Sequence, residues 1–300
     1  MTATPFLYCA AIALLLLPPA WRPWGRGGAI AGPVAGPSTG PIGSAICWVA
    51  GTFAAFYAMR DEWPPWPPTE AEQYWVYGTL LCLVPAVLEA RAFALASVFG
   101  AGLFGAFVWL ASEPLRNHAW ESAELRYQLA GSAALGLATI VLRPRLRRAS
   151  AGEATAATSA GFGNGPSAPG VLAISAGAAA AVLGQSYGGA AHMLGALGLI
   201  AAVLAILAMI RPAGSYATGL ALVWAFSLPA ILVAGVWFAE TPWSSAAIVC
   251  LAPQVARIPL GAGTRPRLAA VTHGLMAAAL GALALWLALR PENPYGDYYG

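Results

Sequence analysis

Ten apolar stretches recur along the chain, and they constrain its fold more than any other feature. A membrane-spanning helix needs about 20 predominantly apolar residues, and each stretch reaches or approaches that length. The stretches are 5–20, 42–59, 74–90, 93–112, 125–142, 170–187, 192–210, 216–239, 243–260 and 268–289. They predict an all-α, polytopic integral membrane bundle of about ten transmembrane helices.

The composition supports the same class. Hydrophobic residues make up 59% of the chain and charged residues 9%, whereas about 25% of the residues of a typical soluble domain are charged. A soluble fold could not cover its surface with so few charges, but lipid tails solvate apolar side chains directly. The net charge of +3 and the lack of a broad basic face argue against a nucleic-acid partner. The lipid bilayer is the partner that the sequence does predict.

The distribution of arginine predicts an orientation. If all ten stretches cross, the loops on one side carry 11 of the 15 arginines and the other side carries four. Cytoplasmic loops of membrane proteins are enriched in basic residues. The arginine-rich side is therefore predicted to be cytoplasmic, with both termini on the other side. The first stretch has no positive n-region and no A-x-A site, so we interpret it as a span and not as a cleaved signal peptide.

A long polar interruption predicts two membrane halves. Residues 1–142 form the first half with five spans, and residues 170–290 form the second half with five more. Residues 143–169 begin with four arginines in six positions and continue with Ala, Thr, Ser and Gly, which is typical of a flexible cytoplasmic linker. Its arginines are expected at the lipid headgroups. Residues 291–300 form a short tyrosine-rich tail.

Residues 60–74 contain two Pro-Pro pairs and predict an extended segment on the non-cytoplasmic side. Thr69 is predicted to cap the next helix, with Glu72 as its capping-box partner. The aromatic residues here are typical of the membrane-interface belt, although they also fit a docking surface for a partner or ligand. They are Trp63, Trp66, Tyr74, Trp75 and Tyr77.

Two similar tetrapeptides suggest an internal repeat. Residues 82–85 read Cys-Leu-Val-Pro and residues 250–253 read Cys-Leu-Ala-Pro, and each follows a loop with acidic, Pro and Trp residues. Chance similarity in apolar sequence is the alternative. Because a proline in a span removes a backbone hydrogen bond, Pro85 and Pro253 are candidate helix breaks. Transporters often place substrate sites at paired broken helices.

Few polar residues lie at membrane depth, and they are the candidate site. Glu89, Gln254 and His273 are predicted either to line one polar cavity or to make separate hydrogen bonds to neighbouring helices. The G-x-G-x-x-G pattern at 100–105 lies inside a span and lacks the strand that a dinucleotide site needs. The G-x-S-x-G pattern at 36–40 lies in a Gly/Pro loop. We therefore assign no catalytic, cofactor-binding or metal-binding residue and expect no cofactor.

These patterns favour a secondary transporter for a small molecule or an ion, in the cytoplasmic membrane of a bacterium. The rival hypothesis is a non-catalytic subunit or scaffold that binds another membrane protein. The Trp/Pro segment and the tyrosine-rich tail favour this hypothesis. An enzyme ranks last, because few polar groups are present to carry out chemistry.

Overall fold

In the computed structural model, the described residues are 40–89, 92–143, 167–210, 220–258, 260 and 266–290. Within these ranges every regular element is a helix. The elements are α2 (Gly40–Arg60), α3 (Ala71–Leu81), α4 (Leu83–Glu89), α5 (Phe93–Ala111), α6 (Glu113–His118), α7 (Ser122–Leu142), α8 (Ser167–Leu183), α9 (Gly188–Ile210), α10 (Leu220–Ala239), α11 (Trp243–Leu251), η2 (Ala252–Arg257) and α12 (Pro266–Leu289).

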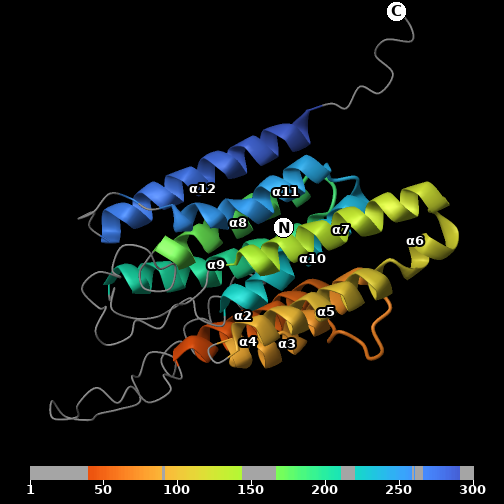
Figure 1. The fold of residues 1–300 in the computed structure, drawn as a ribbon, viewed down its shortest axis with the longest axis horizontal. Helices are drawn as coiled ribbons and strands as arrows, with labels where there is room; N and C mark the ends of the chain where they lie inside the picture. The colour runs from red at the N-terminus through yellow and green to blue at the C-terminus, as the bar shows by residue number, and fades with distance from the viewer. Residues whose placement is uncertain are drawn as a thin grey trace, which may run out of the picture.

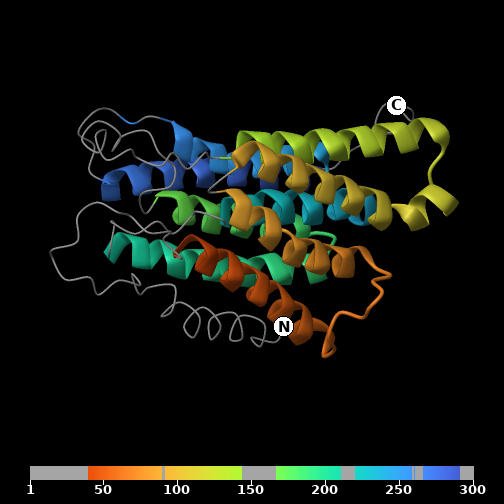
Figure 2. The ribbon, with the colours of Figure 1, turned by 60° about the horizontal axis from the view of Figure 1, so that its bottom comes forward.

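The long helices lie along one axis (Figures 1 and 2). When α3–α4 and α11–η2 are each taken as one interrupted helix, successive long helices run in opposite directions. We call the end where α2 finishes and α3 begins the Arg60 end, and the end where α7 finishes and α8 begins the Arg143 end. Nine of the ten predicted stretches coincide with these helices or helix pairs, and the stretch 5–20 lies outside the described residues. The prediction of an all-helical fold is confirmed for the described residues.

In the part of the chain that the structure describes, five helices are long and apolar enough to cross a membrane by themselves: α5, α7, α10, residues Gly188–Ile206 of α9 and residues Arg267–Leu289 of α12. The outer helices among them expose large apolar side chains, such as Val98, which is 69% exposed, and Leu275, which is 68% exposed. Extended apolar surfaces are rare on soluble monomers, whereas a bilayer solvates them. The helices are therefore consistent with a membrane bundle.

Helix α10 is the centre of the bundle. It packs against α2, α3, α4, α5, α7, α8 and α11, and every residue from Leu220 to Trp237 is buried. A helix that is apolar on all sides belongs in the interior. Because α10 comes from the second half of the chain and packs on five helices of the first half, the two halves share one core.

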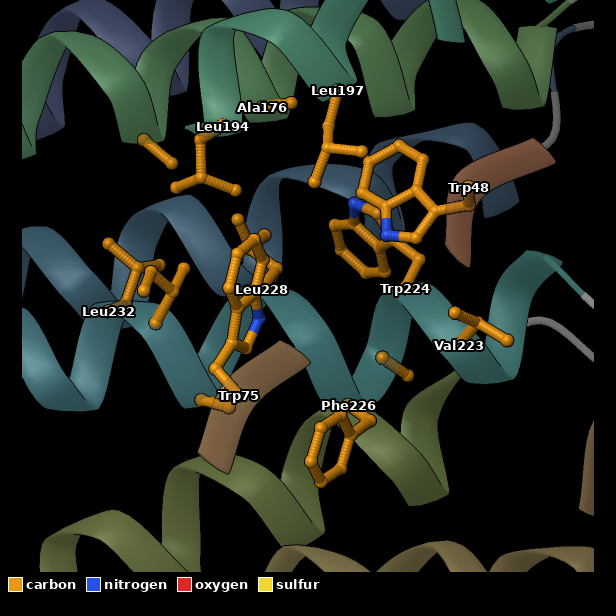
Figure 3. Packing of buried hydrophobic residues seen from close by; sticks show 14 of the residues in the cluster. Trp48, Trp75, Ala176, Leu194, Leu197, Val223, Trp224, Phe226, Leu228 and Leu232 are labelled. Carbon is orange, nitrogen blue, oxygen red and sulfur yellow. The ribbon is translucent and has the colours of Figure 1, made fainter. Parts of the chain in front are cut away.

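Two tryptophans fix α10 to its neighbours through one residue. The indole Nε1 of Trp48 on α2 donates to the Ser227 hydroxyl over 3.1 Å, and that of Trp75 on α3 donates to the Ser227 carbonyl over 2.8 Å. Figure 3 shows both indole rings reaching toward α10. Pro229 removes one hydrogen bond within α10 nearby. The prediction that Trp75 belongs to the membrane-interface belt is wrong, because this residue is fully buried.

Two helices are interrupted beside the candidate prolines. Helix α3 ends at Leu81 and α4 begins at Leu83, two residues before Pro85. Helix α11 ends at Leu251, and the chain continues through Pro253 as the 3-10 helix η2. A proline has no N–H to donate to the carbonyl four residues earlier. That carbonyl belongs to Leu81 in the first case and to Val249 in the second.

The start of α3 differs from the predicted cap. The N-cap is Glu70, and its N3 partner is Gln73, whose side-chain oxygen accepts from the backbone N–H groups of Glu70 (3.2 Å) and Thr69 (2.8 Å). The predicted pairing of Thr69 with Glu72 is therefore displaced by one residue. Glu72 is not the capping partner; it is buried and takes part in an ion pair.

We predict that Gly136→Ala destabilises the protein. A Cβ at this position on α7 would lie within 2.5 Å of three ring atoms of Phe104, and that ring packs against Phe107 and Phe226. Overpacking of this kind costs about 1–3 kcal/mol. Thermal unfolding in nanodiscs measures the effect.

The matched control is Gly102→Ala on α5, because nothing lies within 4 Å of a Cβ there. Both alanines gain about 1 kcal/mol of helix propensity, so their difference isolates the clash. Equal melting temperatures for the two variants would show that α5 and α7 do not pack as described.

Candidate functional site

A buried ion pair joins two helices at the Arg143 end. Glu89 is the last residue of α4, and Arg143 directly follows α7. The Arg143 Nε donates to the Glu89 Oε1 over 2.6 Å. The side chains of Arg143 and Glu89 are 0% and 3% exposed. An ion pair with so little access to water holds both charges inside the protein.

Arg143 also holds the beginning of α5. Its Nη1 donates to the Ser97 hydroxyl over 3.0 Å and to the carbonyl of Ile140. Its guanidinium lies 4.2 Å above the centre of the Phe93 ring, a favourable cation–π position. One side chain therefore fixes the ends of α4, α5 and α7 relative to one another.

The structure changes both boundaries of the predicted linker, residues 143–169. Arg143 was predicted to begin a flexible linker and to face lipid headgroups, but its side chain is completely buried. The predicted linker also ends too late, because its last three residues, 167–169, belong to α8, which begins at Ser167. A bias of basic residues indicates a side of the membrane, but it does not show which arginine turns back into the bundle.

The ion pair leaves hydrogen-bonding capacity unused. Among the described residues, Glu89 Oε2 and Arg143 Nη2 have no hydrogen-bond partner. A guanidinium and a carboxylate can form two parallel bonds, and here one is made. A buried polar atom without a partner costs about 1–3 kcal/mol. The pair is therefore held less firmly than its burial suggests, and a rearrangement of these helices could complete or break it.

A second charged cluster lies at the Arg60 end. Arg60 Nη2 lies 2.9 Å from Glu70 Oε2 and 2.9 Å from Glu72 Oε2. The Glu72 side chain is 4% exposed, and its charge acts on the nearby Tyr187 phenol in the turn between α8 and α9. Burial raises the pKa of Tyr187, and the charge of Glu72 adds to this effect. The phenol therefore keeps its proton beside the carboxylate.

The two clusters lie at opposite ends of the interrupted helix α3–α4. Glu72 is in the first turn of α3 and Glu89 ends α4. Seventeen residues separate them, which is about 25 Å at 1.5 Å per residue. The hydrocarbon core of a bilayer is about 30 Å thick. Each end of the bundle is thus crossed by a network that joins this helix to other parts of the fold.

The other two candidate residues lie in a different group of helices. The Nε2 of His273 lies 3.0 Å from the Ile258 carbonyl, which can only accept, so Nε2 carries a proton in this contact. Gln254 is on η2. The element η2 packs on α8, α11 and α12, whereas α4 packs on α2, α3, α5 and α10. The structure pairs Glu89 with Arg143, and a shared cavity with Gln254 and His273 stays a prediction.

The sequence predicted one residue of the site, Glu89, but not the residues that contact it. Glu89 was a candidate, but Arg143 and Ser97 were not, and neither was the cluster of Arg60, Glu72 and Tyr187. The one available signal was that Glu89 and Arg143 both end predicted spans on the same side of the membrane. Comparison with protein-family models, curated proteins and solved structures finds no match for this chain.

We predict that Arg143→Met destabilises the protein by about 3–5 kcal/mol, because removing one member of a buried pair leaves the other charge uncompensated. The double variant Glu89→Leu/Arg143→Met should lose much less, because both charges are gone. Thermal unfolding of the two single variants and the double variant gives the coupling energy. Arg267→Met is the control, because Arg267 is exposed. A double variant no more stable than Arg143→Met would show that the pair is not coupled.

Proposed function

We propose that the protein is a secondary transporter for a small molecule or an ion, and that the ion pair of Glu89 and Arg143 rearranges during transport. The observation that carries this proposal is that charged networks, each with a buried carboxylate, lie at opposite ends of α3–α4, Glu72 in one and Glu89 in the other. In membrane proteins, buried ionisable groups are costly and mark substrate or ion pathways. Two such networks, one at each end, are what a protein with alternating access needs to close one side at a time.

The interrupted helices support the same proposal. Alternating access moves groups of helices against each other around a site near the bilayer midplane, and broken helices are common there. The interruption at residues 82–85 lies between the two charged networks along the same helix pair. A bend at this point would let the Glu72 end and the Glu89 end move separately. Glu89 and Arg143 are joined by a single hydrogen bond, and such a pair can form and break during transport more easily than a pair with two bonds.

We further propose ten spans in a bacterial cytoplasmic membrane, with both termini on the non-cytoplasmic side. The support is the 11-to-4 division of arginines and the alternating directions of successive helices (Figure 2). In this orientation the Arg143 end is cytoplasmic. Green fluorescent protein inserted at position 155 should then fluoresce, and alkaline phosphatase fused after position 65 should be active. The reverse pattern would contradict the orientation.

Replacing Glu89 by Gln should abolish coupled uptake. The amide keeps the shape of the side chain and removes the charge that Arg143 pairs with. Proteoliposomes that carry a trapped pH dye and receive imposed gradients of sugars, amino acids or nucleosides report the uptake. The wild type should move protons with at least one of these gradients, and the variant should not.

The matched control is Glu70→Gln, which also removes a glutamate from an ion pair but at a side chain that is 51% exposed. It should keep most of the uptake, because exposed pairs contribute little. Full uptake by the Glu89→Gln variant would remove Glu89 from the mechanism.

A non-catalytic membrane subunit is the second candidate, and one observation favours it. Trp63 and Trp66, on the segment between α2 and α3, are 65% and 77% exposed. Their rings are held in place, since Trp63 packs on Tyr57 and Trp66 packs edge-on against Tyr77. Rigid exposed aromatic side chains are suited to binding a partner. Native mass spectrometry after mild extraction separates the two candidates, since a lone monomer counts against this one.

A further inference from the structure

Two arginine–tryptophan stacks lie at the Arg60 end, where α5 and α12 both finish (Figure 1). The guanidinium carbon of Arg116, on α6, lies 3.6 Å from the centre of the Trp109 ring on α5. The guanidinium carbon of Arg290, directly after α12, lies 3.6 Å from the centre of the Trp286 ring. A cation–π contact extends to about 6 Å, so both arginine side chains are closely stacked on the indoles.

Each of these indoles lies at the end of an exposed apolar face. Trp109 is 56% exposed and Trp286 is 50% exposed. Trp109 follows Val98 by eleven residues, and Trp286 follows Leu275 by the same number. Because eleven residues make about three helical turns, each indole shares a face with the most exposed large apolar side chain of its helix. On both helices, a face suited to contact with lipid therefore ends in an indole that a guanidinium covers.

The two guanidiniums carry charges that no carboxylate balances in the described part of the chain, where neither arginine takes part in an ion pair. The Nε of Arg116 donates to the Ser112 hydroxyl over 3.0 Å, and its Nη2 donates to the Trp109 carbonyl over 2.8 Å. Both of these acceptors are neutral. An arginine side chain has five N–H donors, so Arg116 keeps donors for a further acceptor. Within the described residues, the side chain of Arg290 interacts through its stack on the indole.

An anionic phospholipid complements this arrangement. A planar guanidinium binds two oxygens of one phosphate at once. Indole rings lie preferentially at the depth of the lipid headgroups, and the apolar helix face beyond them lies along the acyl chains. A headgroup with an ammonium group brings a second positive charge to the guanidinium, whereas the glycerol headgroup of phosphatidylglycerol does not. The stacks therefore favour lipids that carry a net negative charge.

We propose that each stack binds one anionic phospholipid, such as phosphatidylglycerol. The lipid phosphate accepts hydrogen bonds from the guanidinium of Arg116 or Arg290, and the acyl chains lie along the apolar face that ends in the adjacent indole. These sites are on the surface of the bundle, and they depend on neither the transport function nor the orientation in the membrane.

Native mass spectrometry of the full, delipidated chain measures this binding, because it counts the lipids that stay attached. The probes are dioleoyl phosphatidylglycerol, dioleoyl phosphatidylcholine with the same acyl chains, and glycerol 3-phosphate without acyl chains. We expect phosphatidylglycerol to bind about tenfold more tightly than phosphatidylcholine, which is the size of one charge-assisted interaction, and glycerol 3-phosphate not to bind at the same concentrations. Equal affinity for the two lipids would overturn the proposal. Glycerol 3-phosphate binding as tightly as phosphatidylglycerol would also overturn it, since the occupant would then be a free phosphate.

Substitution of the arginines locates the lipids. Arg116→Gln and Arg290→Gln each remove one guanidinium and leave the indole in place. Each should lose one of the tightly bound phosphatidylglycerol molecules, and the double variant should lose both. The matched control is Arg126→Gln, which removes an exposed arginine at the same end that stacks on no ring of the described residues. It should bind as many lipids as the wild type, and a loss equal to that of the other two variants would show a general attraction of charge and overturn the proposal.

The stack on α12 separates lipid binding from folding. Arg116 also holds the junction of α5 and α6 through its hydrogen bonds, whereas Arg290 and Trp286 are both exposed. Trp286→Leu removes the ring under Arg290 and keeps the charge and an apolar side chain. Without lipid, Trp286→Leu and Arg290→Gln should melt close to the wild-type temperature, because substitutions of exposed side chains change stability little. Both should bind phosphatidylglycerol about tenfold more weakly at this site, and undiminished binding by both would overturn the proposal.

Discussion

The enclosure of α10 is the constraint on which the rest of the bundle depends. Every residue from Leu220 to Trp237 is buried, so seven other elements have to surround this helix. Apolar packing gives that contact little direction, and in a membrane it gives little driving force, because lipid tails are as apolar as the helix. The hydrogen bonds from Trp48 and Trp75 to Ser227 supply what packing cannot, a defined position along α10 for the two helices of the first half. Outside this centre, α5, α7 and α12 can expose apolar side chains because lipid solvates them.

Charge is placed in the bundle where its energetic cost is lowest. Both ion-pair networks lie at helix ends, where the cost of a charge falls from its value at the bilayer centre. Glu89 pairs with Arg143, which is distant in sequence, and Glu72 pairs with Arg60 and lies close to Tyr187 of the second half. Among the described residues, the interior between them holds no buried charged side chain, and it contains the interruption of α3–α4. This arrangement holds the ends and leaves the middle able to bend, which is the physical basis of the proposed transport function.

Hydropathy was sufficient to predict the helices but not what holds them together. Hydropathy distinguishes residues that lie in a membrane from residues that lie in water. The predicted span 93–112 therefore differs by only one residue from α5 (Phe93–Ala111). Hydropathy does not distinguish side chains that face lipid from side chains that face other helices, because both surroundings favour the same apolar residues. Trp75 was therefore predicted at the interface, although it is buried against α10, and Arg143 was predicted in a linker. The pairing of Glu89 with Arg143 spans 54 residues, and no local pattern encodes such a contact. The cap of α3 was displaced by one residue for a simpler reason, since Thr69 and Glu70 can both begin a helix.

The central claim, that α10 is enclosed within a membrane-embedded bundle, is tested most directly by photolabelling with a carbene reagent dissolved in the lipid of nanodiscs. The label attaches to protein surface that contacts lipid, and mass spectrometry of the fragments locates it. The account predicts strong labelling of α5 and α12, whose apolar side chains are exposed, and none between Leu220 and Trp237. Labelling within α10 comparable to that of α5 would contradict its central position, and the absence of label from α5 and α12 would contradict the membrane bundle.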